Sequence, residues 1–549
     1  MEKIIQELEN KLIQSEEKLQ VSESERRKLE DKNAELAKLV AYYEERFRLS
    51  QHKLFAQSSE KSKADENQTL LIFDEAENEA DIRYKEPTSE KITYTRKKRA
   101  YSHKDDISSL PIEVIEHSIP EEERICPECG GQMHVMGHDS RQELTIIPAQ
   151  VKVVEHRREI YSCRNCERNN ITVPVIKTPM PKPVIKGSAA SASFIAHIMA
   201  QKFINAVPLY RQEMSFLQHD FFLSRQTMAN WLINTSQKWL KPIYEIMHRT
   251  LLKEEILHAD ETVLQVLKEP GRASRSESYM WLYRTGGYAS NPIVLYEYKP
   301  TRSSSHPKEF LNGYTGYLHT DGYAGYKTLA RENNGITLCG CWAHARRKFH
   351  EAVQALPPEE QQTGNHESQK GLEYCNSLFA LERRYENISI EERHIQRLQH
   401  SKPITDQLFK WANALSVKVL PKSLLGKAVT YVLEQKPYLE TFYKDGRLEV
   451  SNNRAERSIK PFVIGRKNWL FCCTPKGAES SSIIYSMIET AKANGLKPYE
   501  YLKHILETIP NIQNKEDYNT LLPWSKELPQ SCRLKADKPN KDNDSVLEA

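Results

Sequence analysis

The sequence contains no uninterrupted apolar run that approaches the ~20 residues of a membrane-spanning helix. Its first residues, MEKIIQELENKLIQSEEKL, are too highly charged for a secretory signal peptide. A strong charge of either sign is also missing, because 78 Lys and Arg residues oppose 74 Asp and Glu residues and leave +4. Overall charge therefore does not indicate a nucleic-acid partner, and any basic DNA-binding surface must be local. We expect a cytoplasmic protein whose ten cysteines are thiols or metal ligands rather than disulfides.

The length and composition predict several domains joined by polar segments. At about 100–200 residues per domain, 549 residues correspond to about three to five domains. Apolar residues make up 39% of the chain and charged residues 28%, so part of the length should be solvated helix or linker. The middle of the chain still holds enough large apolar residues to bury a sizeable core.

Residues 1–50 lack both glycine and proline and follow a heptad pattern. Nine of the thirteen positions on the three-four heptad step are apolar: Ile5, Leu8, Leu12, Leu19, Leu29, Leu36, Val40, Tyr43 and Phe47. Asn33 falls at an a position, where asparagine selects register and oligomeric state. The pattern predicts a coiled coil between chains; the alternative is a single solvated helix that packs on its own protein.

A basic run lies in residues 51–110, which we predict to be a linker. An acidic stretch, DEAENEAD, is followed by the four basic residues Arg96, Lys97, Lys98 and Arg99. Such runs are usually only solvated, but basic arms also bind phosphate. The four residues are therefore candidate DNA contacts.

Two CxxC pairs predict a zinc site. Cys126 and Cys129 form the first pair, and Cys163 and Cys166 form the second. Four thiolates complete a tetrahedral sulfur site with no open position, so the ion should be structural. The alternatives are a redox CxxC or buried core thiols, and the second matching pair disfavours both.

The other cysteines show no comparable pairing. The stretch CGCWAH carries Cys339, Cys341 and His344, which are metal-ligand residue types. We nevertheless expect a buried strand end there, because lone thiols are commonly buried.

A possible helix-turn-helix follows the cysteine module. Residues 208–217 predict one helix, and residues 224–232 predict a second with Ser224 as its N-cap. A second helix in this layout would offer Arg225, Gln226 and Asn230 to DNA. A helical hairpin that only packs on the protein has the same pattern, so both interpretations stay open.

Two aspartates lie in a strand-rich segment between residues 251 and 350. Asp260, in LHADETV, lies near the centre of an apolar strand, and its neighbour Glu261 should point to the opposite face. Asp321, in GYLHTDGYAGY, ends a second short strand. Either aspartate alone would be assigned to a turn or a cap. Two together favour a shared divalent cation, because a buried acid is costly unless it is paired or holds a metal.

A third acid, Glu456, lies in SNNRAERSIKP, where Asn452 or Asn453 can cap a helix. Basic residues that suit the binding of phosphate follow it: Arg457, Lys460, Arg466 and Lys467. The alternative is an ordinary exposed glutamate, as Glu434 or Glu489 would be. The residue pattern alone leaves the choice of the third acid open.

At these residues the sequence resembles the transposases of insertion-sequence family 66, the large TnpC-type proteins. The matching motifs occur in order from about residue 40 to 525: LSQHKLFAQSSEK, ICPECGGQM, PLYRQE, LHADET, TDGYAGY, CWAHARRKF, SNNRAERSIKPFVIGRKNWLF, YLKHILETIP and LLPW. Small departures are Ala56, where glycine is expected, and Lys460, where arginine or leucine is usual. The resemblance implies an RNase-H-like core with the catalytic triad Asp260, Asp321 and Glu456, interrupted by a helical insertion.

We therefore predict a multidomain α+β protein with an RNase-H-like α/β catalytic core. Its predicted segments are a coiled coil at 1–50, a linker at 51–110, a zinc-ribbon-like module at 111–180, a helical DNA-binding region at 181–250, the first part of the core at 251–350, a helical insertion at 351–445, the second part of the core at 446–508, and a C-terminal element with a disordered tail after Trp524 at 509–549.

The resemblance implies a DNA transposase that cuts the ends of an insertion sequence and joins them to target DNA. Its triad would hold two magnesium ions, with manganese as a substitute, and its zinc would be structural. The implied partners are double-stranded DNA, further copies of the chain through the coiled coil, and small accessory transposition proteins. Its implied location is the cytoplasm, at the nucleoid.

Two other functions remain as alternatives. One is a catalytically inactive DNA-binding regulator, which would lack one of the acids. The other is an RNase-H-like nuclease such as a Holliday-junction resolvase, which would cleave DNA without joining it to a target.

Overall fold

The computed structural model describes residues 2–55, 151–162, 164, 168, 175–364 and 366–534. The chain divides into two units, residues 1–57 with 181–549 and residues 58–180. In the smaller unit, β1 (Ile160–Ser162) pairs antiparallel with β2 (Val175–Lys177) on either side of the second cysteine pair. The predicted zinc ligands and the basic run lie outside the described residues: Cys126, Cys129, Cys163, Cys166, Arg96, Lys97, Lys98 and Arg99.

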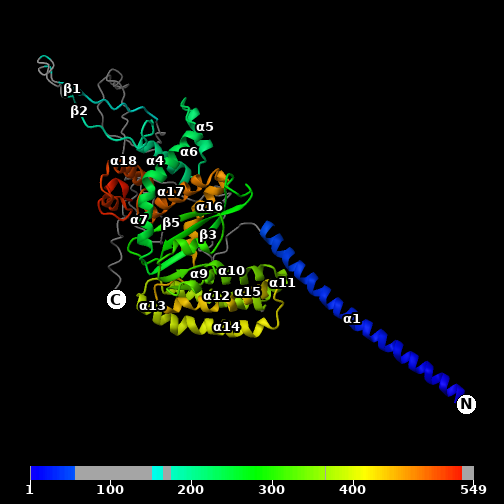
Figure 1. The fold of residues 1–549 in the computed structure, drawn as a ribbon. Helices are drawn as coiled ribbons and strands as arrows, with labels where there is room; N and C mark the ends of the chain where they lie inside the picture. The colour runs from blue at the N-terminus through cyan, green and yellow to red at the C-terminus, as the bar shows by residue number, and fades with distance from the viewer. Residues whose placement is uncertain are drawn as a thin grey trace, which may run out of the picture. The chain divides into compact units, whose positions relative to one another are not determined.

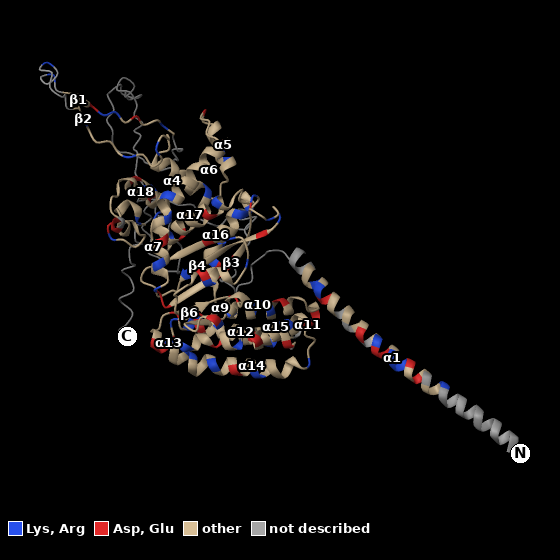
Figure 2. Ribbon diagram, viewed as in Figure 1, with Lys and Arg blue, Asp and Glu red and all other residues tan. Residues whose placement is uncertain are grey.

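The predicted N-terminal helix is present as α1 (Glu2–Phe55). Figure 2 shows that both charge signs occur along its described part. Apolar heptad residues are 50–63% exposed in the single chain: Leu19, Leu29, Leu36, Val40, Tyr43 and Phe47. Near its end, Arg48 Nε donates to the Ala355 carbonyl over 2.9 Å, and the Glu45 carboxylate accepts from the Leu424 N–H over 3.2 Å. These six residues of the apolar stripe are therefore uncovered in one chain.

A five-stranded mixed sheet forms the centre of the larger unit (Figure 1). Its strands are β3 (Ile256–Gln265), β4 (Glu277–Thr285), β5 (Val294–Lys299), β6 (Gly316–His319) and β7 (Ile336–Cys339). They lie in the order β5-β4-β3-β6-β7, with β3, β6 and β7 parallel and β4 antiparallel to both of its neighbours. The strand-rich interpretation of residues 251–350 is therefore confirmed.

Helices cover both faces and one edge of this sheet. On the face that carries Asp260, the Tyr296 hydroxyl of β5 donates to the Ser458 carbonyl of α16 (Asn453–Trp469). On the opposite face lie α8 (Ser305–Phe310) and α9 (Ala324–Glu332), whose Tyr326 ring packs edge-on against Trp281 of β4. At the edge, hydroxyls of α17 (Pro475–Ala493) accept the free N–H groups of β5, which protects an otherwise unpaired strand.

A further group of helices, from segments that precede and follow the sheet in the sequence, packs against this core. It comprises α4 (Ala192–Phe203), α5 (Leu209–Leu217), α6 (Arg225–Thr235), a π-turn (Ser236–Leu240), α7 (Lys241–Leu251) and α18 (Pro498–Thr508). Their apolar faces join the sheet and α17 in one continuous core. Among the described residues, no helix combines the length and the apolar character needed to cross a membrane.

The helical insertion has an apolar core of its own. It comprises α10 (Trp342–Gln354), α11 (Pro358–Thr363), α12 (Glu367–Arg384), α13 (Ile390–Gln396), a π-turn (Arg397–Ser401), α14 (Lys402–Ser416), α15 (Leu424–Leu439) and a 3-10 turn (Thr441–Lys444). Arg397 is buried within it, pairs with Glu382 over 2.6 Å and donates to three backbone carbonyls. The first helix of the insertion begins at Trp342, nine residues before the predicted boundary at residue 351.

Ordered structure continues past Trp524. Short 3-10 turns cover Ile509–Asn511, Lys515–Leu521 and Gln530–Cys532. The Lys497 N–H donates to the Cys532 carbonyl over 2.7 Å, and Leu528 and Cys532 are buried. The prediction of a disordered tail is therefore wrong for residues 525–534, because backbone hydrogen bonds to the start of α18 hold this polar segment.

Candidate active site

Asp260 lies at the centre of β3, the strand paired on both of its sides. Burial raises the pKa of Asp260 well above its usual range, and the negative charges of Glu261, Asp321 and Glu456 raise it further. The charges of Asp321 and Glu456 thus act on Asp260, and the three acids predicted from the sequence lie in one region of the structure.

Asp321 follows β6 and lies level with Asp260. His258 of β3 pairs with His319 of β6, and two further residues along each parallel strand lead to the two aspartates. Gly322 has φ +95°, a conformation that favours glycine, and starts the turn into α9. Within this turn the Tyr323 N–H donates to Asp321 Oδ1 over 2.9 Å, which fixes the direction of the carboxylate.

Glu456 lies in the first turn of α16. Asn452 occupies the predicted N-cap position, but its side chain makes no cap hydrogen bond. Its side chain instead contacts β3, where Oδ1 lies 2.9 Å from His258 Nδ1 and Nδ2 donates to the Ala259 carbonyl over 2.9 Å. Asn452 therefore attaches the start of α16 directly beside Asp260, a role that the cap interpretation missed.

Two residues of α10 contact Glu456 from the insertion side. Arg347 Nη2 lies 3.3 Å from Glu456 Oε2, and His344 Nδ1 lies 3.7 Å from Oε1. Cys341, His344 and Glu456 each offer a ligand atom within 4.8 Å of the others, although the Cys341 Sγ also accepts the Asn452 N–H. Cys339 and Cys341 are buried at the end of β7, as expected, but the neighbouring His344 reaches the acids. The motif CWAHARRKF was the available signal for both contacts.

Glu261 points away from Asp260, as the alternation along a strand predicts. Its carboxylate pairs with Arg302 and accepts the Tyr326 hydroxyl of α9 over 2.9 Å. Neither Glu261 nor Arg302 was identified from the sequence as a site residue.

The basic residues after Glu456 extend along α16. Arg466 Nη1 lies 3.4 Å from Thr262 Oγ1 of β3, and Arg457 and Lys467 are exposed. Lys460 is partly buried on the same helix. The four predicted phosphate-binding residues thus lie on the same helix as Glu456. Glu456 lies in its first turn, whereas Arg466 and Lys467 lie in its last turn.

The predicted helical pair is formed by α5 and α6. Ser224 caps α6 as expected, because its Oγ accepts the Thr227 N–H over 3.1 Å. The candidate DNA-reading residues Arg225, Gln226 and Asn230 are exposed on α6. They lie apart in sequence and element from the three acids.

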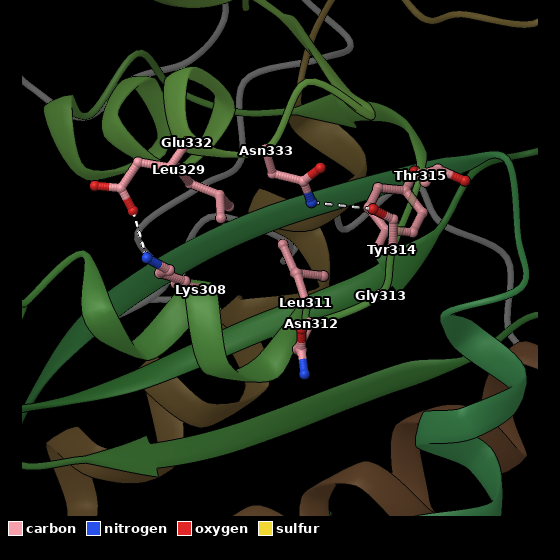
Figure 3. A pocket seen from close by; sticks show the side chains of 9 residues that line it. All are labelled: Lys308, Leu311, Asn312, Gly313, Tyr314, Thr315, Leu329, Glu332 and Asn333. Atoms are coloured by element: carbon pink, nitrogen blue, oxygen red, sulfur yellow. Dashed lines mark hydrogen bonds and ion pairs between the residues drawn. The ribbon is translucent and has the colours of Figure 1, made fainter.

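A hollow of about 360 Å³ lies elsewhere on the larger unit (Figure 3). Its lining comes from the ends of α8 and α9 and from Gly313–Thr315, the turn before β6. Lys308 and Glu332 form an ion pair of 2.6 Å there, and Asn333 donates to the Tyr314 carbonyl. Since Asp321 follows the opposite end of β6, this hollow is separate from the carboxylates.

Asp260→Asn is expected to stabilise the protein in buffer without added divalent cations. Folding raises the pKa of Asp260, so this carboxyl group does not destabilise the fold well below the usual value of 3.8, and the destabilisation grows as the pH rises from 3.8 towards the folded pKa. Thermal unfolding should show a melting temperature higher by about 2–4 °C for each kcal/mol relieved, with a larger gain at pH 8 than at pH 5. The exposed control Asp406→Asn should change it little. A lower melting temperature for Asp260→Asn would contradict the repulsive cluster.

Protein-family models match the chain in the order of these structural parts. A model described as "Transposase IS66 family" matches residues 187–480, which include all three acids. The "zinc-finger binding domain of transposase IS66" matches residues 123–167, which include both CxxC pairs and support zinc binding. The "IS66 C-terminal element" matches residues 486–524, and "Transposase C of IS166 homeodomain" matches residues 42–115.

Curated relatives are similar over most of their length. The chain is 32% identical over 417 residues to the uncharacterized protein y4jD of Sinorhizobium fredii, which covers 74% of this chain and 79% of that protein. It is 30% identical over 412 residues to y4hP and 29% identical over 425 residues to y4qI of the same organism, with 73% and 75% of each chain covered. Because the first family model spans more than half of the sequence, the chain belongs to the IS66 family of transposases.

Proposed function

We propose that this transposase cuts the ends of its insertion sequence and joins them to target DNA, with Asp260, Asp321 and Glu456 as its catalytic carboxylates. The observation that carries the proposal is the convergence of these acids from β3, the turn after β6 and α16. Burial raises the pKa of Asp260 and the charges of Glu261, Asp321 and Glu456 raise it further, as expected of an acid in a site that can hold a cation.

The residues present fit magnesium. Carboxylate oxygens are the ligands that this hard cation prefers. Glu456 Oε1 is buried and accepts no hydrogen bond from the described residues, so it has a free ligand position. Bound divalent cations would activate water or a DNA 3′-hydroxyl and stabilise the leaving oxygen. The chain's own contribution is to hold Asp321 through the Tyr323 N–H and to hold the start of α16, which carries Glu456, through the Asn452 side chain.

The sheet topology supports an RNase-H-like core. In that fold the first three strands form an antiparallel meander, and the fourth and fifth lie parallel to the first on its other side. The order β5-β4-β3-β6-β7 and the strand directions have this arrangement. The helical insertion separates the second aspartate from the glutamate, as expected from the family resemblance.

DNA contacts are assigned by charge and position. We infer that Arg457 and Lys460 hold phosphates near the site and that Arg466 and Lys467 hold phosphates farther along the DNA, because the first two lie near Glu456 on α16 and the other two lie in its last turn. We infer that Arg225, Gln226 and Asn230 on α6 contact the element ends, together with the zinc module and the basic run Arg96–Arg99. The exposed apolar stripe of α1 supports self-association through a coiled coil.

A strand-joining assay with the full chain tests the proposed function. Its substrates are a duplex that carries the element end, identified from the inverted repeats that flank the gene, and a supercoiled target plasmid. With magnesium, we expect cleavage at the end and covalent joining to the plasmid. Cleavage without joining would favour a nuclease or resolvase, and binding without cleavage would favour a regulator.

A further inference from the structure

Arg302 is held by Glu261, on the face of β3 opposite Asp260, and lies against Tyr323 of the turn that carries Asp321. It lies in the loop between β5 and α8, and its Nε donates to Glu261 Oε1 over 2.8 Å. Its Nη2 donates to the same oxygen. The guanidinium carbon lies 4.1 Å from the centre of the Tyr323 ring, within the range of a cation–π contact. The guanidinium is therefore fixed by a carboxylate and by an aromatic face.

Both carboxylate oxygens of Glu261 take part in this arrangement. Its side chain is only 2% exposed, and its second oxygen, Oε2, accepts the Tyr326 hydroxyl. A buried carboxylate is stable only when its partners satisfy it, and Arg302 supplies the compensating charge. Glu261 is therefore the anchor that sets the position of Arg302.

The same network reaches the catalytic acids through Tyr323. The Tyr323 hydroxyl donates to the Arg302 carbonyl, and its backbone N–H donates to Asp321 Oδ1 over 2.9 Å. Burial lowers the pKa of Arg302, but the charge and the hydrogen bond of Glu261 raise it above its usual value, and the charge of Asp321 adds a smaller contribution. One turn thus positions both a catalytic carboxylate and a fixed cation.

Arg302 also has donor capacity left. Its side chain is 41% exposed, and its Nη1 makes no hydrogen bond with any residue that the structure describes. A guanidinium presents donors in a planar fork, which suits phosphate oxygens. An arginine that served only to neutralise Glu261 would not need a guanidinium that is exposed and held in one orientation.

We propose that Arg302 binds a backbone phosphate of the DNA on the side of the active site where Asp321 lies, and that Glu261 and Tyr323 are positioning residues for it. The proposal rests on the strand-joining function proposed above. Phosphate contacts of this kind fix where the DNA lies on the protein but do not read its sequence. Because the guanidinium is held before DNA arrives, little conformational entropy is lost on binding.

Joining kinetics of the full chain test the role of Arg302. Over a range of DNA and KCl concentrations, Arg302→Ala should raise the KM for the end duplex by about fivefold at ~0.15 M salt, and reduce the magnitude of the salt slope of kcat/KM by about 1. Glu261→Gln should raise KM by a smaller factor. The double variant should match Arg302→Ala, because Glu261 acts through Arg302. The exposed arginine of α9 gives the matched control, Arg331→Ala, which should keep the wild-type KM.

Neutral phosphate analogues identify the contact. Methylphosphonate is placed at one phosphate at a time beside the cleavage point of the duplex. One position should weaken wild-type joining by about fivefold and weaken Arg302→Ala by less than about twofold, since the contact is already lost there. Equal losses in both proteins at every position would overturn the proposal.

The remaining outcomes separate this inference from the proposed function. If Arg302→Ala lowers the melting temperature but keeps the wild-type KM and salt slope, Arg302 only neutralises Glu261 and the inference is wrong. If the wild-type protein joins no DNA, the proposed function fails and the inference fails with it.

Discussion

Glu456→Gln is expected to abolish magnesium-dependent cleavage and joining while the protein still binds the element ends. The substitution keeps the size and hydrogen-bonding capacity of the side chain but removes its charge. Two aspartates then remain, from β3 and the turn after β6, and the site loses the ligand supplied by α16. Several kcal/mol of transition-state stabilisation correspond to a rate loss of about 1,000-fold or more.

The measurement is strand cleavage and joining on labelled duplex, with end binding followed separately. Glu434→Gln is the matched control, because Glu434 is exposed on α15 and should remain active when changed. Glu449 is less suitable, since its carboxylate pairs with Arg454 of α16 and its loss would disturb the helix itself. Near-normal cleavage by Glu456→Gln, or an equal loss in the control, would show that the third ligand is misassigned.

Removing zinc is expected to have the second largest effect. The paired cysteines predict about one zinc per chain, bound with an apparent free energy of roughly 10 kcal/mol or more. Cys126→Ser combined with Cys163→Ser should release the ion and unfold the module around residues 111–180. The sheet and its helices belong to the other unit and have their own core, so they should stay folded.

Metal analysis and limited proteolysis check this expectation. Cys473→Ser is the control, because Cys473 is exposed in the larger unit and its loss should leave the zinc content unchanged. End binding should weaken in the zinc-free variant if the module contacts DNA. A fully folded wild-type protein without zinc would disprove the assignment.

Local signals in the sequence were enough to predict the strands and to single out Asp260 and Asp321 as candidate site residues. Apolar segments separated by turn residues predicted the sheet, and Asp260 was conspicuous as an acid within such a segment. The close approach of Asp321 depends on the register between β6 and β3, which no local pattern encodes. The family resemblance, rather than spacing, selected Glu456 from the other glutamates.

The contacts that were missed join segments far apart in the chain. Asn452 has the residue type of a helix cap, but its side chain bonds to His258 and Ala259 because α16 starts against β3. Arg347 reaches Glu456 only because the first helix of the insertion packs beside α16. Such pairings depend on tertiary packing, which overrides the local preference of each residue.

The separate core of the insertion has a consequence for the order of folding. Asp321 and Glu456 lie on either side of it in the sequence, so a long loop must close before α16 can dock on β3. Helical segments with mainly local contacts form quickly. In the folded chain, the Gly340 N–H donates to the Tyr438 carbonyl and the Trp342 N–H donates to the Val450 carbonyl, so the insertion begins and ends at neighbouring points.

Early folding of the insertion would leave only a short connection to close, and the mutually repelling carboxylates would assemble last. Substitutions in the buried apolar residues of the insertion, such as Phe349 or Leu408, should therefore slow the recovery of activity after refolding without touching the catalytic site.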